Sequence, residues 1–331
     1  MKLNRLPQLD GLRAIAVSCV MVFHFIPSIE RIAPLGSIGV RLFFVLSGFL
    51  ITRILLASRG KDLGSALRSF YIRRSLRIFP VFYLVLAITA AMNIGPVRST
   101  IGWHVTYLTN LYLFNRGSWH GSISHLWSLA VEEQFYLIWP WLMLLLPERA
   151  LRPMIVAMIC LAPIPRLLIG GPMNSVLPTS CLDSLGAGAL IAVAGRPLFH
   201  VAIGPLLLLG GLAFGWDVAV DFGVSLTAAH VVAGAASGFG GVAGRILTAK
   251  PIAFVGTISY GLYLFHGFMP YVLGRYVPGF VDITWPLRFA MLTTATFAVA
   301  SVSWQVLEAP ILSLKDRLSG RRAVGPSTVA A

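Results

Sequence analysis

The stretch LDGLRAIAVSCVMVFHF, residues 9–25, decides the fold because it places two ionisable side chains on one face of an apolar helix. Arg13 and His24 are eleven positions apart. At 100° per residue, this spacing makes three turns plus about 20°, with the two residues about 16 Å apart along the axis. That distance is about half of the ~30 Å hydrocarbon thickness of a bilayer. With Arg13 at one interface, His24 lies near the midplane, where an ionisable residue indicates a functional site.

Apolar runs of this kind continue through the whole chain of 331 residues. Hydrophobic residues make up 57% of it and charged residues 11%, whereas a soluble domain has about 25% charged residues. Lys2 and Arg5 precede the first run, but no small-residue cleavage site follows, so we expect an uncleaved anchor. The composition predicts an all-α, polytopic membrane bundle with about ten transmembrane helices. We place the spans at residues 10–28, 37–57, 78–95, 125–146, 154–171, 179–195, 198–215, 222–242, 252–274 and 286–307.

The distribution of basic residues predicts the orientation of these spans. With the N-terminus inside, most of the 26 lysines and arginines fall in cytoplasmic segments. The positive-inside rule therefore favours two cytoplasmic termini, and it explains most of the net charge of +14 without nucleic acid. We expect one membrane domain over residues 1–315 and a short, disordered cytoplasmic tail over 316–331. The moderately apolar stretch 96–124 is expected to form an interfacial or re-entrant helix on the outer side.

Several kinds of site are excluded by the motifs. The sequence has no P-loop, no dinucleotide-binding fingerprint and no metal-ligand spacing, so we expect no metal. Cys19, Cys160 and Cys181 lie in or beside apolar runs and form no disulfide framework, so we expect them to act as small hydrophobic side chains. Any chemistry must lie within the bundle or at its faces.

His24 is the first candidate catalytic residue. Burial disfavours the charged imidazole, so His24 is expected to be neutral and able to accept a proton from a hydroxyl as a general base. The alternative is a structural histidine that hydrogen-bonds a neighbouring helix, which is common in membrane bundles. The spacing from Arg13 alone does not decide between the two interpretations.

Arginines are concentrated between the second and third expected spans, where Arg74 and Arg77 lie three positions apart and Arg73 adjoins them. On a helix, this spacing places two guanidinium groups on one face at the cytoplasmic interface. Guanidinium groups bind phosphate bidentately, so we predict a phosphate clamp. Ordinary positive-inside anchoring, or attraction to anionic lipid, is the alternative interpretation.

Two adjacent carboxylates, Glu132 and Glu133, lie inside the expected span 125–146. An acid at mid-helix costs at least ~2.5 kcal/mol on insertion scales, so both side chains need compensation. Adjacent residues point about 100° apart, so we expect one to orient an arginine or histidine and the other to face a wet cavity. His125 and Ser128, near the outer end of this span, are expected to lie where an external acceptor arrives.

Two later segments also carry polar residues inside the membrane. Asp183 is an acid within a short, Gly-rich span. Ser259, Tyr263 and His266 follow an i, i+4, i+7 pattern and can line one helix face. Asp183, Tyr263 and His266 are therefore candidate substrate-contacting residues, and helix packing is the alternative explanation for each.

Together these motifs resemble the bacterial membrane-bound acyltransferase family 3, the O-acyltransferases of surface glycans. The motifs follow one another in the family's order along nearly the whole chain. Several motifs in this order identify the family far more specifically than a single motif does. They are LDGLRAIAV at 9–17 with Phe23 and His24, GVRLFFVLSGFLI at 39–51, Arg74 with Arg77, HLWSLAVEEQFY at 125–136, SYGLYLFH at 259–266 and Glu308-Ala309-Pro310.

The resemblance implies a multi-helix enzyme of the bacterial cytoplasmic (inner) membrane that uses cytoplasmic acyl-CoA, usually acetyl-CoA, as its co-substrate. It implies that Arg13 and His24 belong to the family's essential arginine–histidine pair, and that Arg74 and Arg77 meet the CoA phosphates. Many members also carry a C-terminal SGNH-type esterase domain. We expect none here, with transfer completed in the bundle or by a separate partner.

One departure from the family pattern concerns the acid of the Leu-Asp-Ser-Leu-like motif. Members often have a basic residue two positions before this acid, whereas Cys181 stands there in this sequence. The resemblance therefore gives Asp183 weaker support than the other site residues.

These features predict transfer of an acyl group from acyl-CoA, bound from the cytoplasm, to an acceptor hydroxyl at the outer side, with His24 as the base. An acyl-histidine relay is the alternative mechanism. The acceptor is left open among lipopolysaccharide, exopolysaccharide, peptidoglycan, a lipid-linked sugar and a secreted small molecule. The competing class is a secondary transporter or exporter of a glycolipid or small solute, which predicts inverted repeats that the sequence does not show.

Overall fold

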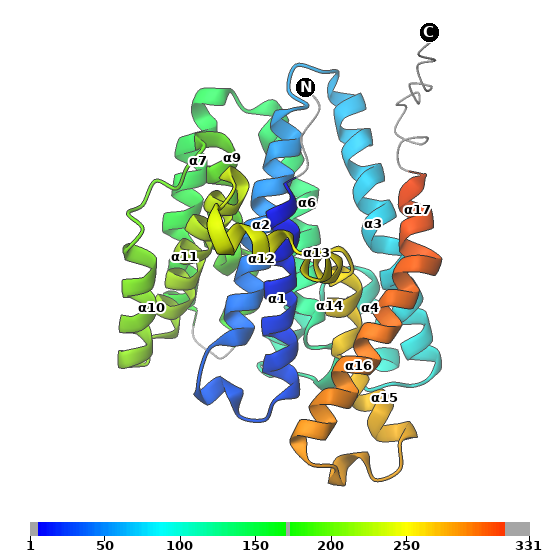
Figure 1. The fold of residues 1–331 in the computed structure, drawn as a ribbon. Coiled ribbons are helices and arrows are strands. Elements are labelled where there is room, and N and C mark those ends of the chain that lie inside the picture. Colours follow the sequence, from blue (N-terminus) through cyan, green and yellow to red (C-terminus); the bar gives the residue numbers. More distant parts are fainter. Residues whose placement is uncertain (1–5, 170–172, 315–331) are drawn as a thin grey trace.

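Most of the long helices stand side by side along one axis in the computed structural model of the chain, which describes residues 6–169 and 173–314 (Figure 1). Within these ranges there is no strand. The α-helices are α1 (Pro7–Phe25), α2 (Leu35–Leu56), α3 (Leu63–Ala91), α4 (Val97–Val105), α5 (Thr109–Arg116), α6 (Leu126–Leu145), α7 (Glu148–Leu161), α8 (Pro163–Leu168), α9 (Leu182–Ala194), α10 (Ile203–Phe214), α11 (Asp217–Ser237), α12 (Gly241–Thr248), α13 (Lys250–Thr257), α14 (Ser259–His266), α15 (Met269–Tyr276), α16 (Trp285–Ser303) and α17 (Ala309–Ser313). Short 3₁₀ turns are η1 (Ile29–Arg31), η2 (Gly121–Ile123), η3 (Asn174–Val176), η4 (Pro178–Cys181) and η5 (Phe280–Asp282), and the π-helical turn η6 (Trp304–Glu308) joins α16 to α17.

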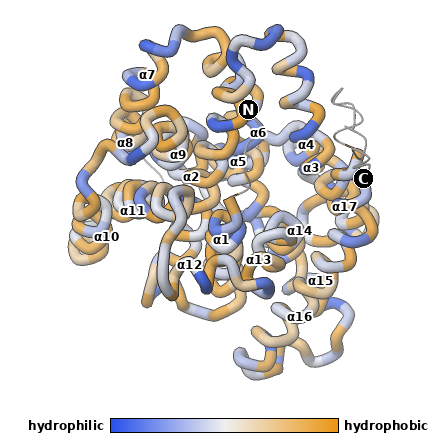
Figure 2. The backbone as a smooth tube through the Cα atoms, turned by 45° about the horizontal axis from the view of Figure 1, so that its top comes forward, coloured by the Kyte–Doolittle hydropathy of each residue, from blue (hydrophilic) through white to orange (hydrophobic). Residues whose placement is uncertain are grey.

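Length and hydropathy confirm the prediction of an all-α, polytopic membrane bundle. Hydrophobic residues run along the helices, and hydrophilic residues are concentrated near helix ends such as the start of α7 (Figure 2). Leu206, Leu209 and Phe214 on α10 are exposed, as expected for side chains that face lipid. Among the described residues, six segments can cross a membrane by length and composition: Pro7–Phe25, Leu35–Leu56, Leu63–Ala91, Glu148–Leu168, Asp217–Ser237 and Trp285–Ser313. Two shorter apolar segments are Pro178–Ala194 and Ile203–Phe214.

Helix α2 lies at the centre of the bundle, because α1, α6, α9 and α11 all pack against it. Its contact with α9 depends on two glycines. A Cβ atom on Gly48 would overlap the backbone of Leu185, and one on Gly188 would overlap the backbone of Val45. Small residues let two membrane helices approach this closely. The contact fixes α2, whose residues line both of the cavities described below.

Helix α3 begins fifteen residues before the span predicted from the sequence, which started at residue 78. It begins at Leu63, because the side chain of Asp62 accepts a 2.8 Å hydrogen bond from the backbone N–H of Ser65 and caps the helix. The arginine-rich segment is therefore part of one continuous helix that leads into the bundle.

The ninth predicted span, 252–274, is not one straight helix but is divided among α13, α14 and α15. In Figure 1, α13 is seen nearly end-on, whereas α14 runs downward beside α16. Pro270 has no N–H to continue the hydrogen bonding of α14, which ends at His266, and it lies in the first turn of α15. This break places His266 at a helix end.

The stretch 96–124 forms two short helices, α4 and α5, which pack on α3 and α6. Their position relative to a membrane surface stays a prediction. The predicted disordered tail, 316–331, lies outside the described residues.

Candidate active site

Two cavities in the described part of the bundle contain the predicted site residues, and the arginines line the smaller one. Its volume is about 240 Å³, and Arg13, Arg74, Arg77 and Glu132 all line it. We call it the inner cavity, because its arginines come from the N-terminal halves of α1 and α3, which begin at the same end of the bundle (Figure 1). One face of α2 supplies an apolar wall that consists of Val40, Phe43, Phe44, Leu46, Leu50, Ile51 and Ile54.

Positive charge predominates in the inner cavity. Arg13 forms an ion pair with Asp10 (2.6 Å), which neutralises one of the three guanidinium groups. Arg74 packs over the ring of Tyr136, 4.1 Å from its centroid. In the described part of the chain, neither Arg74 nor Arg77 forms an ion pair. This excess of positive charge suits a polyanionic ligand such as a phosphate ester.

Glu132 and Glu133 have different environments, as their divergent directions on α6 predict. One oxygen of Glu132 accepts from the hydroxyl of Ser47 (2.7 Å) and the other accepts from that of Tyr136 (3.0 Å), at the wall of the inner cavity. Glu133 is absent from the linings of both cavities, and its buried Oε1 has no hydrogen-bond partner among the described residues. Glu132 is thus the carboxylate that can act on a ligand in the inner cavity.

The larger cavity, of about 690 Å³, contains the predicted histidines. His24 from the end of α1, His125 from the start of α6 and His266 from the end of α14 all line it. The His266 ring lies 4.9 Å from that of His24 and 4.9 Å from that of His125, measured between centroids. We call it the outer cavity, because α1 ends and α2 begins at its level, at the opposite end of the bundle from the inner cavity.

Backbone carbonyls determine which nitrogen of each imidazole carries the proton. A carbonyl oxygen only accepts, so Nδ1 of His24 donates to Val20 (2.9 Å) and Nδ1 of His266 donates to Tyr263 (2.5 Å). In a neutral ring, Nε2 then carries the free lone pair. Nε2 of His266 is buried without a hydrogen-bond partner in the described structure. Nε2 of His125 lies 3.0 Å from the carbonyl oxygen of Leu264, a contact that favours the tautomer protonated at Nε2.

Three side chains, Val40, Phe44 and Tyr263, line both cavities and form a partition between them. The hydroxyl of Tyr263 donates to the carbonyl of His125 (2.9 Å) and accepts from the hydroxyl of Ser128 (2.6 Å). Ser128 faces the inner cavity and His125 the outer cavity. The predicted polar stripe on α14 therefore reaches both compartments.

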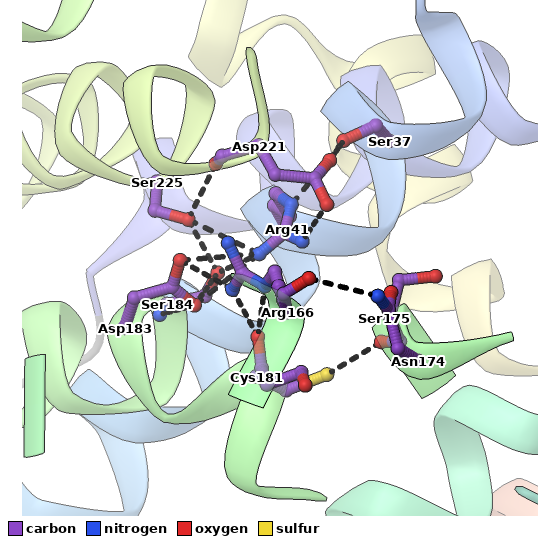
Figure 3. A network of polar contacts seen from close by, with 11 residues as sticks. Ser37, Arg41, Arg166, Asn174, Ser175, Cys181, Asp183, Ser184, Asp221 and Ser225 are labelled. Carbon is purple, nitrogen blue, oxygen red and sulfur yellow. Dashed lines mark hydrogen bonds and ion pairs between the residues drawn. The ribbon is translucent and has the colours of Figure 1, made fainter. Parts of the chain in front are cut away.

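Asp183 lies away from both cavities, in a buried network of charges (Figure 3). It pairs with Arg41 (3.2 Å) and with Arg166 (2.6 Å). Arg41 also pairs with Asp221 of α11, at the wall of the outer cavity. These contacts give Asp183 a part in holding Arg41, and they do not bring it to either cavity as a substrate contact.

The cavities contain polar residues that the sequence analysis did not select. Arg41 lies in the family-like motif at 39–51, and an arginine inside an expected span was the available signal. Ser47 and Tyr136 lie in the family-like motifs, but only the fold shows that they bond Glu132. Asp221 had no signal beyond being an acid beside an expected span. Arg73, which was selected, lines neither cavity.

Comparison with known proteins adds an independent finding. A family model described as an acyltransferase domain matches residues 6–305. The peptidoglycan O-acetyltransferase OatA of Listeria monocytogenes is 29% identical over 361 residues, covering 92% of this chain and 55% of the relative. The putative peptidoglycan O-acetyltransferase YrhL of Bacillus subtilis is 30% identical over 375 residues, covering 96% of this chain and 56% of the relative.

A putative O-acetyltransferase of Staphylococcus aureus is 37% identical over 153 residues, 42% of this chain and 25% of the relative. The chain thus spans about half the length of the first two relatives. No solved structure matches it.

Proposed function

The chain belongs to the acyltransferase domain family, and from that premise we propose that it is a membrane O-acetyltransferase that passes an acetyl group from acetyl-CoA to a hydroxyl of a glycan on the outer side. The observation that carries the proposal is the pair of cavities with opposite chemistry. Arginines line the inner cavity and histidines the outer one, and three side chains separate them.

The inner cavity is the proposed donor site. Arg74 and Arg77 bind the phosphates of acetyl-CoA, because they are cationic and form no ion pair within the described residues. Arg13, held by Asp10, orients the donor farther along the cavity. The apolar face of α2 accommodates the pantetheine arm, which brings the thioester to the partition at Tyr263 and Ser128.

His24 is the proposed general base. Its Nε2 lone pair takes the proton of the acceptor hydroxyl, and the hydroxyl oxygen attacks the thioester carbonyl. A carbon–oxygen bond forms, the carbon–sulfur bond breaks, and the proton passes from His24 to the departing thiolate. The products are an acetyl ester and free CoA. The Val20 carbonyl keeps Nδ1 protonated and so keeps Nε2 available for this step.

We place the enzyme in the bacterial cytoplasmic membrane with both termini in the cytoplasm, about ten spans over residues 1–315, and 316–331 as a tail. The arginines of the inner cavity then face the compartment that contains acetyl-CoA. The names of OatA and YrhL favour peptidoglycan as the acceptor over lipopolysaccharide.

Release of CoA from acetyl-CoA tests this function. The purified protein in detergent, given a bacterial cell-wall glycan extract, is expected to release free thiol, and His24→Ala is expected to abolish the release while binding acetyl-CoA normally. The matched control is His200→Ala, because His200 is exposed in the α9–α10 connection. Near wild-type release by His24→Ala would rule out the proposed base. A wild-type protein that neither binds acetyl-CoA nor releases CoA would favour a transporter.

A further inference from the structure

The outer cavity has polar groups that acetyl transfer by His24 does not use. Ser37 and Arg41 of α2 and Asp221 of α11 line it. Ser122 lies in the turn before α6 and lines it from another segment. A cavity of about 690 Å³ is within the ~300–1,000 Å³ typical of small-molecule sites, in which a few placed polar groups determine the ligand.

Several polar side chains hold the guanidinium group of Arg41 (Figure 3). One terminal nitrogen bonds Asp183 (3.2 Å) and the hydroxyl of Ser184 (3.2 Å), both fully buried. Arg166 fixes Asp183 through a 2.6 Å ion pair. The other terminal nitrogen of Arg41 bonds Asp221. Two arginines therefore balance two carboxylates, and Arg41 holds the Asp221 carboxylate at the cavity wall.

The Asp221 carboxylate and the Ser37 hydroxyl form one hydrogen-bonding unit. Ser37 donates to Oδ1 of Asp221 (2.7 Å) and accepts from Nε of Arg41 (3.2 Å). A carboxylate has about four lone-pair positions, and Ser37 and Arg41 take only part of this capacity. The unit can therefore accept hydrogen bonds from two neighbouring hydroxyl or amide groups of one ligand.

Two more residues that line the same cavity each have a polar atom without a partner in the described protein. These atoms are Oγ of Ser122 and Nε2 of His266, and both are buried. Buried polar groups are normally hydrogen-bonded. Both residues line the cavity, so this part of its wall also carries polar side chains, which favour a ligand with hydroxyl groups over a simple apolar tail.

Flat aromatic side chains also line the outer cavity. They include Trp119, Trp127 and Tyr271, and Trp119 is half exposed. The face of an aromatic ring carries negative charge density, so it attracts the C–H groups on the face of a pyranose ring. Aromatic faces combined with acceptors for adjacent hydroxyls match a sugar, which has an apolar face and a polar edge.

We propose that the outer cavity is a saccharide subsite, in which Asp221 and Ser37 bind adjacent substituents of one pyranose ring, Trp119 stacks on its face, and a further hydroxyl of the same acceptor reaches His24. This subsite rests on the proposed function, since it positions the acceptor of that reaction. It makes Asp221 and Trp119 specificity-determining residues that take no part in the proton transfer.

The test measures CoA release against the concentration of a defined sugar, the β-1,4-linked tetramer of N-acetylglucosamine, with dodecanol as an alcohol that has no ring. The variants are Asp221→Asn, Ser37→Ala and Trp119→Leu. Asp217→Asn is the matched control, because Asp217 is an exposed acid in the first turn of the same helix. We expect the tetramer to saturate the wild type and Asp221→Asn to raise the KM for the tetramer about tenfold, the effect of one lost hydrogen bond to a charged group. Ser37→Ala and Trp119→Leu are also expected to raise this KM, through loss of a hydroxyl contact and of ring stacking.

The KM for acetyl-CoA is expected to stay unchanged in all three variants, which separates loss of acceptor binding from loss of fold. Ser37→Ala and Trp119→Leu keep every charge, so they test the subsite even if Asp221→Asn disturbs Arg41. The subsite would be overturned if dodecanol or a crude extract stimulated CoA release and the tetramer did not. It would also be overturned if the variants left the KM for the tetramer unchanged. Either result would leave the proposed acyltransferase function standing. No CoA release by the wild type with any acceptor would instead contradict the proposed function.

Discussion

At the scale of single residues, the tautomer of His24 is determined by the helix that carries it. The Val20 carbonyl, one turn earlier, accepts from Nδ1, so a neutral His24 presents a basic nitrogen to the outer cavity. Arg13 lies near the other end of α1 and lines the inner cavity. One helix thus supplies a residue to each compartment, which agrees with the shared face predicted from their spacing.

Arg77 allows a test of the donor site. Replacing Arg77 with alanine is expected to raise the KM for acetyl-CoA about tenfold or more, because a hydrogen bond to a charged group contributes ~1.5–3 kcal/mol. Arg68→Ala is the matched control, since Arg68 is an exposed arginine of the same helix. Steady-state kinetics with varied acetyl-CoA gives the result, and equal KM values for the two variants would count against phosphate binding by Arg77.

The sequence was informative about residues wherever a charge interrupts an apolar run, because such charges are rare in membrane helices. Arg13 and Glu132 were found in this way, whereas the arginines of α3 were found by their spacing between two expected spans. Partners on other helices could not be found, since the contacts of Ser47 and Asp221 depend on how α2 meets α6 and α11. The same rule also selected Asp183, which the fold places beside Arg166 and not at a cavity.

At the scale of elements, the contact of α2 with α9 supports the site, because α2 lines both cavities. Gly188→Ala is expected to destabilise the protein by about 1–3 kcal/mol, as overpacking does, since the added Cβ would overlap the backbone of Val45. A lower melting temperature in detergent would show this effect.

The matched control for Gly188→Ala is Gly210→Ala in α10, because an added Cβ there has no atom within 4 Å. Alanine is also the better helix former, so this control is expected to be neutral or slightly stabilising. If Gly188→Ala and Gly210→Ala had the same melting temperature, the close contact of α2 with α9 would not contribute to the stability of the protein.

Element boundaries followed from the sequence only in part. Long apolar runs placed α1, α2 and α6 within three residues of their observed bounds, because their hydropathy is continuous, whereas the span predicted for α11 begins five residues late. The early start of α3 depends on the cap at Asp62, and the division of span 252–274 depends on Pro270 and on packing around α14. Such local features leave the average hydropathy almost unchanged.

At the scale of the whole molecule, the described ends of the chain, at α1 and α17, lie at the same end of the bundle as the α2–α3 connection (Figure 1). If this end is cytoplasmic, Lys61→Cys is expected to react with a membrane-impermeant maleimide only after spheroplasts are permeabilised. Val281→Cys, in the exposed η5 turn at the opposite end, is expected to react in intact spheroplasts. Both are made after Cys19, Cys160 and Cys181 are replaced, and the reverse labelling would invert the proposed orientation.

The overall class was the most predictable property, because composition and motif order extend over nearly the whole chain. The division of the interior into two cavities was not predictable, since it depends on which side chains of α2, α6 and α14 meet. That division supplies the argument for transfer between compartments.

The partition of Val40, Phe44 and Tyr263 also bears on the electrical insulation of the membrane. A cytoplasmic membrane maintains a potential, and each elementary charge that crosses 100 mV releases about 2.3 kcal/mol. A continuous water column through the bundle would conduct protons and discharge this potential. Two apolar side chains and a tyrosine held by two hydrogen bonds lie between the two cavities, in the path of such a column. In the proposed orientation and function, this partition would let acetyl groups be transferred across the membrane while the membrane potential is maintained.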